Sequence, residues 1–243
     1  MTDIDLQAQT SVEGTSERLS AYVARPSTPG PWPGVVVIHE AFGVDDVMRR
    51  QADRLASAGY LAVMPDLFTH GGARRCLWAT LAALKKGEGR SFTDIEAARA
   101  WLVDADDCTG KIGVIGFCMG GGFALMVASG GGYKVTAANY GVVPSDPDGA
   151  LAGACPVVAS YGGRDRALKG AAGKLEASLD RVGVPHDVKE YPAAGHSFLN
   201  DGPAGPRWMQ PLLKVTNVGP EPESARDAWA RIESYFDQHL RAG

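Results

Sequence analysis

Apolar residues cluster along this chain in short continuous runs, separated by longer stretches of mixed polarity. A run such as the valine-rich segment at residues 34–40 leaves no polar face, which is typical of a strand buried on both faces of a parallel sheet. We predict buried strands at residues 34–40 and 60–66, and further strands at 111–117, 135–141, 155–163 and 186–192.

The stretches between these runs repeat their apolar positions every three or four residues, the spacing of an amphipathic helix. They predict helices at residues 45–58, 91–104, 120–130, 169–183 and 223–241. Residues 4–25 alternate instead about a turn at residues 13–16, which indicates an antiparallel hairpin. Together these elements predict an α/β fold with a doubly wound, mostly parallel sheet and an N-terminal antiparallel hairpin, in a single domain over residues 1–243.

The composition of the chain argues against nucleic acid and membranes as partners. The formal net charge is −4, so the chain lacks the basic surface that nucleic acid requires. The longest apolar runs are far shorter than a membrane span, and the acidic, polar start does not resemble a signal peptide. We therefore expect a cytoplasmic protein, monomeric or a small homo-oligomer, that contacts neither membrane nor nucleic acid.

The four cysteines show no CxxC pairing and no metal-type spacing, so we expect free thiols, no metal and no cofactor. Only Cys118 has an informative context. It lies between Gly116 and Gly120, where a predicted strand turns directly into a predicted helix. Flanking glycines avoid clashes in so sharp a turn, and the start of a helix favours a thiolate. A tight turn around an inert thiol is the structural alternative.

Two further groups follow predicted strands and favour the catalytic interpretation. Asp165 comes after the strand at 155–163, and His196 comes after the strand at 186–192. Their order along the chain, nucleophile then acid then histidine, is that of α/β-hydrolases. We expect His196 to exchange the proton of Cys118 and Asp165 to orient the imidazole. Ser197 is a weaker candidate nucleophile because it is not in such a turn.

Acyl transfer also requires hydrogen-bond donors for the oxyanion of the tetrahedral intermediate. The backbone N–H of Met119, directly after the nucleophile, is one candidate. The second should come from the loop after the strand at 34–40, from the N–H of Ala41 or of Phe42. His39 is expected to pack beneath this site.

With these motifs in place, the sequence resembles the dienelactone hydrolase family of α/β-hydrolases. The likeness covers almost the whole chain, and it is carried in order by VVVIHEAFGV (35–44), LAVMPDLF (61–68), IGVIGFCMGG (112–121), YGGRD (161–165) and GHSF (195–198). The resemblance implies the α/β-hydrolase fold and a Cys118–His196–Asp165 triad. It also assigns a role to Glu40, which would restrain the resting thiol and help remove its proton when a substrate carboxylate enters.

Family members that open dienelactone bind the substrate carboxylate with arginines, one of them shortly after the catalytic histidine. Asn200 stands four residues after His196 in this chain. Arg74 or Arg75 is expected to supply the other clamp, with Trp78 and Phe42 as apolar substrate contacts. The departure at Asn200 makes dienelactone itself a doubtful substrate and leaves a small lactone or ester.

We therefore expect a cofactor-free hydrolase that forms a thioester at Cys118. A thiol-based redox sensor or detoxification protein that oxidises the same cysteine is the alternative, and a binding module that retains only the fold is a third hypothesis. The Gly- and Pro-rich segment at residues 198–224 is expected to border the pocket, so that trimming 202–220 would change substrate choice more than folding.

Overall fold

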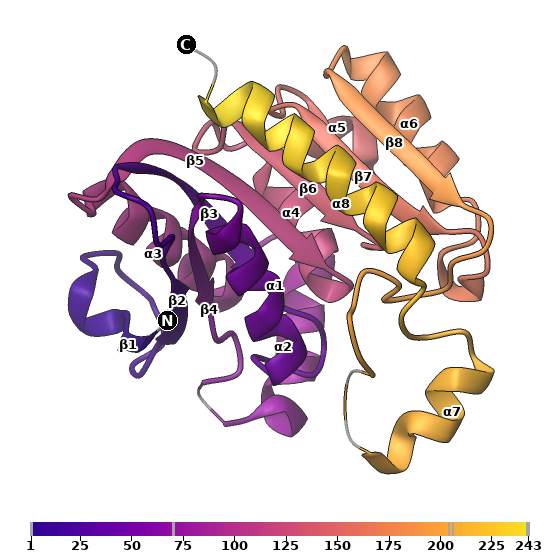
Figure 1. The fold of residues 1–243 in the computed structure, drawn as a ribbon, viewed down its shortest axis with the longest axis horizontal. Coiled ribbons are helices and arrows are strands. Elements are labelled where there is room, and N and C mark those ends of the chain that lie inside the picture. The colour runs from indigo at the N-terminus through magenta and orange to yellow at the C-terminus, as the bar shows by residue number, and fades with distance from the viewer. Residues whose placement is uncertain (1, 70, 204, 206, 242–243) are drawn as a thin grey trace.

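The computed structural model describes residues 2–69, 71–203, 205 and 207–241; the side chains at 73, 74 and 207 are outside the described part. Its centre is an eight-stranded sheet in the order β1-β2-β4-β3-β5-β6-β7-β8 (Figure 1). The strands are β1 (Thr2–Asp5), β2 (Ser20–Ala24), β3 (Trp32–Ile38), β4 (Leu61–Pro65), β5 (Cys108–Phe117), β6 (Val135–Asn139), β7 (Val157–Gly162) and β8 (His186–Tyr191).

The pairing of these strands confirms the predicted α/β class. Strands β3 to β8 pair in parallel, whereas β2 pairs antiparallel with both β1 and β4. The predicted tight turn at residues 13–16 is wrong, because residues 6–19 form a longer connection that contains the 3₁₀ turn Gln7–Gln9. Leu6 and Leu19, both fully buried, close that connection through a Leu6 N–H to Leu19 carbonyl bond of 2.7 Å.

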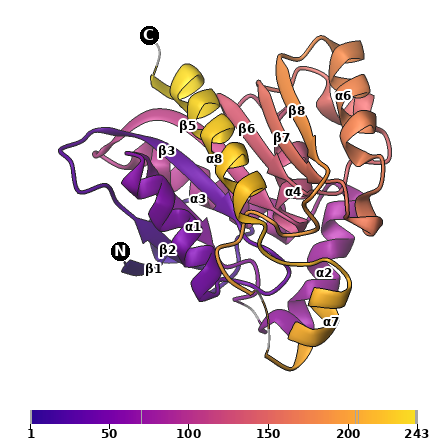
Figure 2. The ribbon, with the colours of Figure 1, turned by 45° about the vertical axis from the view of Figure 1, so that its right-hand side comes forward.

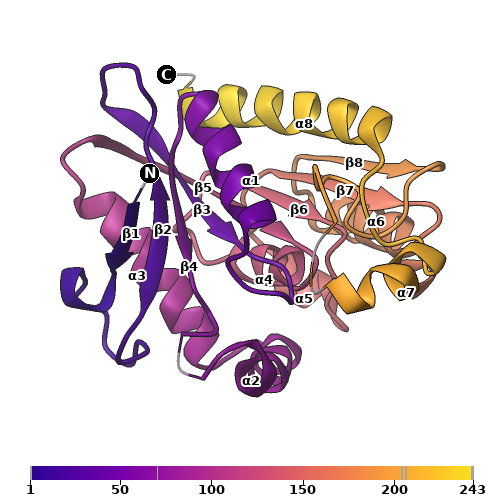
Figure 3. The same cartoon turned by 60° about the horizontal axis from the view of Figure 1, so that its bottom comes forward.

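Helices cover both faces of the sheet. In Figure 1, α1 and α8 lie in front of the strands, and α3, α4 and α6 lie behind them; Figure 3 shows α8 running along one face. The helices are α1 (Asp46–Ser57), α2 (Ala73–Lys86), α3 (Arg90–Asp104), α4 (Met119–Val127), α5 (Pro147–Leu151), α6 (Ala171–Val182), α7 (Gln210–Val215) and α8 (Pro222–Phe236), which continues as a π-helical turn (Asp237–Arg241). Within the described part, no helix is long and apolar enough to cross a bilayer.

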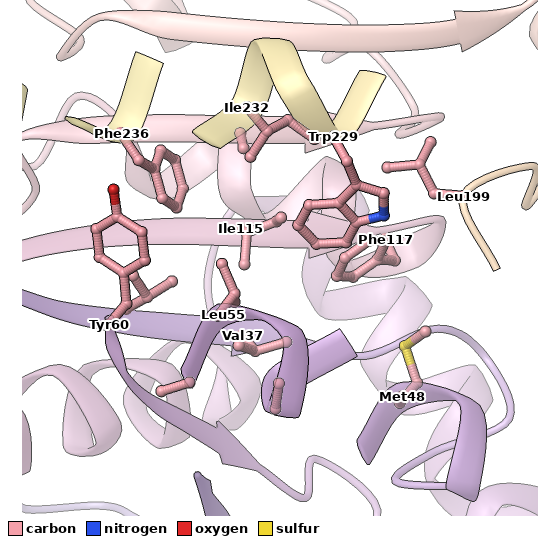
Figure 4. Close-up of a cluster of buried hydrophobic side chains, with 14 of the residues drawn as sticks. Val37, Met48, Leu55, Tyr60, Ile115, Phe117, Leu199, Trp229, Ile232 and Phe236 are labelled. Atoms are coloured by element: carbon pink, nitrogen blue, oxygen red, sulfur yellow. The ribbon is translucent and has the colours of Figure 1, made fainter. Parts of the chain in front are cut away.

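The packing of α1 and α8 fixes one face of the core. Apolar side chains of both helices meet the valines and isoleucines of the central strands, and Trp229 and Phe236 are almost completely buried (Figure 4). The Asp45 carboxylate caps α1 by accepting the Met48 N–H at 2.9 Å. The apolar stripe of each helix therefore faces the sheet, which leaves the carboxyl ends of the parallel strands free for chemistry.

Helices α2, α5 and α7 were not predicted. Helix α5 is only five residues long, although Asp146 caps it and Pro147 follows that cap. Helix α2 follows Gly72, which offers no capping side chain, so nothing marks its start. Helix α7 contains a proline in its first turn and lies within the Gly- and Pro-rich segment that suggested a loop. In Figures 1 and 2, α2 and α7 lie beyond the carboxyl ends of the parallel strands.

Candidate active site

Cys118 lies at the turn from β5 into α4, with the strained backbone that its neighbours predicted. Its φ of 55° is a conformation that non-glycine residues rarely adopt. A Cβ on Gly116 would lie 1.9 Å from the Gly120 carbonyl oxygen, and a Cβ on Gly120 would lie 2.1 Å from the Ile38 carbonyl oxygen. Both glycines are therefore required for α4 to begin directly against the end of β3.

His196 and Asp165 lie together at the same edge of the sheet. The Nδ1–H of His196 donates to Asp165 Oδ2 at 2.5 Å, and the Asp165 side chain is 4% exposed. The other Asp165 oxygen accepts the Ala167 N–H at 3.0 Å. The carboxylate is thus fully engaged, and it fixes both the tautomer and the orientation of the imidazole.

The charges of these groups depend on one another. Burial by itself would lower the pKa of His196, but its hydrogen bonds to Asp165 and Cys118 and the charges of both raise that pKa to about 10. Burial would raise the pKa of Asp165, yet the hydrogen bond and charge of His196 hold it below its usual value. The arrangement favours an imidazolium between a carboxylate and the sulfur of Cys118.

The backbone of His196 is held on both sides by a distant segment. Its N–H donates to the Asn217 carbonyl at 2.9 Å, and its own carbonyl accepts the Gly219 N–H at 2.8 Å. A Cβ on Gly195 would lie 1.8 Å from the Asn217 carbonyl oxygen, so only glycine permits this approach. The segment after His196 therefore borders the candidate site and also fixes the backbone of His196, a structural role that the sequence did not reveal.

Glu40 lies at the end of β3 and is 2% exposed. The side-chain amide of Asn200 donates to both of its carboxyl oxygens at 3.3 Å. Burial raises the pKa of Glu40, whereas the charge of His196 and hydrogen bonds from Ser197 and Asn200 reduce the shift. Glu40 is therefore a buried carboxyl and not a solvated loop residue.

Sequence reasoning missed two residues beside this carboxyl. The ring of Tyr140, at the end of β6, lies 5.1 Å from the ring of His196, and its buried hydroxyl interacts with the Glu40 carboxyl. Burial raises the pKa of Tyr140 well above 10, and the charges of Glu40 and Cys118 add to the rise. The Gln51 amide donates to the Leu199 carbonyl at 3.1 Å and so supports the segment that carries Asn200. The position of Tyr140 at the end of a predicted strand could have indicated that it lies near the site. No feature of the sequence indicated the role of Gln51.

The two residues predicted to donate to an oxyanion, Met119 and Ala41, lie near the start of α4. Met119 is the first residue of α4, so its N–H has no acceptor within the helix. Ala41 directly follows Glu40, and the contact of Gly120 with the end of β3 brings this loop against the start of α4. The ring of Phe42 instead contacts Gly205, where a Cβ would lie 2.7 Å from ring atoms.

The remaining predicted substrate contacts lie on or near α2. Arg75 is exposed and lines a cavity between α2 and the start of α3, together with Cys76 and Asp94, so the structure does not bring it to Cys118. Trp78 is 77% exposed. The side chain of Arg74 lies outside the described residues. Among the described residues, no group of three His, Cys, Asp or Glu is placed to hold a metal ion.

Comparison with known proteins identifies the family of this chain. Residues 19–240 match the model of the dienelactone hydrolase family. The carboxymethylenebutenolidase of Rhodococcus opacus is 32% identical over 91% of this chain and 87% of its own length. A dienelactone hydrolase candidate from Klebsiella pneumoniae superposes with a TM-score of 0.77 at 25% identity, covering 94% of this chain and 97% of that one. A dienelactone hydrolase from Anabaena variabilis, with a TM-score of 0.67 at 19% identity over 95% and 96% of the two chains, shares the fold. This chain therefore belongs to the dienelactone hydrolase family of α/β-hydrolases.

Proposed function

We propose that this hydrolase opens a small lactone or carboxylic ester with Cys118 as nucleophile, through a thioester intermediate. The observation that carries the proposal is the position of the His196 imidazole, which is hydrogen-bonded to a buried carboxylate and interacts with the Cys118 sulfur. An imidazole held in this way can store the thiol proton and return it to a leaving group.

The reaction divides into two acyl transfers. The Cys118 thiolate attacks the carbonyl carbon, and the N–H groups of Met119 and Ala41 stabilise the oxyanion. When the C–O bond breaks, the His196 imidazolium gives its proton to the alkoxide, which remains tethered if the substrate is a lactone. Neutral His196 then removes a proton from water, the resulting hydroxide attacks the thioester, and the proton returns as the acid and the thiol are released.

Glu40 and Asn200 shape the choice of substrate. The carboxyl of Glu40 is buried near His196, whose charge lowers its pKa, and the neutral amide of Asn200 donates to both of its oxygens. A second carboxylate placed here would add like-charge repulsion in a site that excludes water. We therefore expect uncharged lactones and esters to react faster than substrates that carry a carboxylate.

Apolar surface around the catalytic edge supports an uncharged substrate. Among the described residues, all but one of the exposed large apolar side chains lie on α2, directly after β6, or on α7 and the turn before it. They are Trp78, Leu81, Val142, Trp208, Leu212 and Val215. Apolar surface gathered near one edge of a protein commonly marks a binding site, so Trp78 keeps its proposed role as a substrate contact.

The test is turnover of p-nitrophenyl acetate and of a panel of neutral and carboxylated lactones by the wild type and by Cys118→Ala. We expect Cys118→Ala to lose activity on every substrate of the panel. Equal rates for the two proteins would refute the assignment of the nucleophile. Absence of hydrolysis in the wild type, together with peroxide oxidation confined to Cys118, would instead support the thiol-sensor alternative.

A further inference from the structure

His39 is a fully buried histidine whose two ring nitrogens both contact backbone. Its Nε2 accepts the Leu67 N–H at 3.1 Å, which requires the proton to be on the other nitrogen. Its Nδ1–H therefore donates to the Glu40 carbonyl oxygen, at 2.7 Å. The imidazole links the end of β3 to the segment after β4, and its tautomer is fixed by these two bonds.

The Glu40 carbonyl belongs to the same planar peptide as the Ala41 N–H. Within the described residues the Gly30–Pro31 bond is the only cis peptide, so the Glu40–Ala41 peptide is trans and its N–H points opposite to its C=O. The Gly43 N–H also donates to this carbonyl, at 3.1 Å. Because His39 and Gly43 together fix the direction of the C=O, they also fix the direction of the N–H on the other side of the plane.

We propose that His39 is a positioning residue that aims the Ala41 N–H at the oxyanion of the tetrahedral intermediate. The inference rests on the proposed function, since it deepens the role given to Ala41. Among the described residues, His39 contacts the Glu40 carbonyl, the Leu67 N–H and the Phe68 ring, so its effect acts through the peptide that it holds. An oxyanion donor is effective only when it is fixed before the reaction, because a mobile donor must reorganise as charge develops.

Close packing around His39 makes the position of the Ala41 N–H sensitive to the hydrogen bond between His39 and the Glu40 carbonyl. A Cβ on Gly120, in the first turn of α4, would lie 2.9 Å from the His39 carbonyl oxygen. The chain around His39 is thus pressed against the turn that carries Cys118. The ring of Phe68 contacts the imidazole edge-on at 4.9 Å and restricts its movement. A rotation of the Glu40–Ala41 peptide would therefore displace the donor from its place beside the nucleophile.

The experiment compares two reactions of the same sulfur. Hydrolysis of p-nitrophenyl acetate develops an oxyanion, whereas alkylation of Cys118 by iodoacetamide does not. We expect His39→Leu to lower kcat/KM for the ester by at least about tenfold, toward the roughly 100-fold loss that follows removal of an oxyanion donor. The alkylation rate, corrected with Cys118→Ala for the other cysteines, should stay within about twofold of wild type because the thiol and its histidine are untouched.

Two further variants, His39→Asn and His186→Leu, distinguish an effect on the position of the Ala41 N–H from an effect on folding. In His39→Asn the side-chain N–H lies as many bonds from the backbone as Nδ1, so we expect most of the ester activity to return. His186 provides the matched control, because its Nδ1 lies 2.8 Å from the Val184 carbonyl at the start of β8, away from the site. His186→Leu should leave both rates unchanged.

Three results would overturn the proposal: a proportional fall of both rates in His39→Leu, an unchanged ester rate, or no rescue by asparagine. If His39→Leu does not fold, the ester and alkylation rates of His39→Asn and His39→Gln are compared instead. Glutamine places its amide one bond further from the backbone than Nδ1, so His39→Gln takes the place of His39→Leu in the comparison. Failure of the proposed function would be distinct, because wild type would then hydrolyse the ester no faster than Cys118→Ala.

Discussion

Replacing Glu40 by glutamine should make the protein more stable, and the gain in stability should grow with pH. The carboxyl is 2% exposed, and its bonds from Asn200, at 3.3 Å, are longer than the 2.7–2.9 Å typical of charge-assisted hydrogen bonds. An incompletely compensated buried charge costs about 1–3 kcal/mol. Glutamine keeps the shape and the hydrogen-bonding capacity of the side chain and removes the charge.

The sign of the pH dependence follows from the direction of the shift. Burial raises the pKa of Glu40 in the folded protein. Its protonated form therefore stabilises the fold below the unfolded-state pKa near 4.5, and that stability is lost as pH rises through the folded-state value. Glu40→Gln does not undergo this loss, so its advantage over wild type should be small at acidic pH and largest at pH 8.

Thermal unfolding at several pH values between 5 and 8 measures this difference. For a chain of this length, about 1–3 kcal/mol corresponds to a Tm rise of about 2–12 °C at pH 8. Asp165→Asn is the matched control, and it should lower the Tm. The pKa of Asp165 is lowered in the folded protein, so its charged form stabilises the fold. A Tm change in Glu40→Gln that is absent, negative or independent of pH would refute the account of Glu40 as a buried, under-compensated carboxyl.

Other predictions follow from individual contacts. Asp165→Asn should reduce kcat by about 10³–10⁴-fold in steady-state ester hydrolysis, because the imidazole loses its orienting carboxylate; retained kcat would contradict the triad. Tyr140→Phe should lower the stability measured by urea unfolding by about 1 kcal/mol, because it deletes a buried hydroxyl that interacts with the Glu40 carboxyl; a gain in stability would contradict that interaction. Deleting residues 203–220 should abolish hydrolysis of every substrate, because Asn217 and Gly219 hold the backbone of His196; a protein with altered substrate choice but full activity would disprove that role.

The sequence predicted the parts of the site that follow strand ends. Apolar runs located the parallel strands, and their carboxyl ends meet at one edge of the sheet. Asp165 and His196 could thus be placed together before any coordinates were known, and the glycines around Cys118 marked the sharp turn. These inferences needed only local pattern and general topology.

Contacts between distant loops could not be predicted in this way. Nothing in the pattern indicates that Asn217 pairs with His196, because that bond depends on the path of residues 201–216 between them. The orientation of the Tyr140 hydroxyl and the support of Asn200 by Gln51 are likewise products of packing. The arginine clamp was expected from resemblance alone, and the direction of α2 takes Arg75 to another cavity.

Covalent labelling tests the central claim most directly. Wild-type protein mixed with p-nitrophenyl acetate is quenched in acid within the first turnovers, digested and analysed by mass spectrometry. The account predicts one acetyl group on the peptide that contains Cys118, and none on Cys118→Ala. Steady hydrolysis with the acetyl group on another residue, such as Ser197, would contradict it.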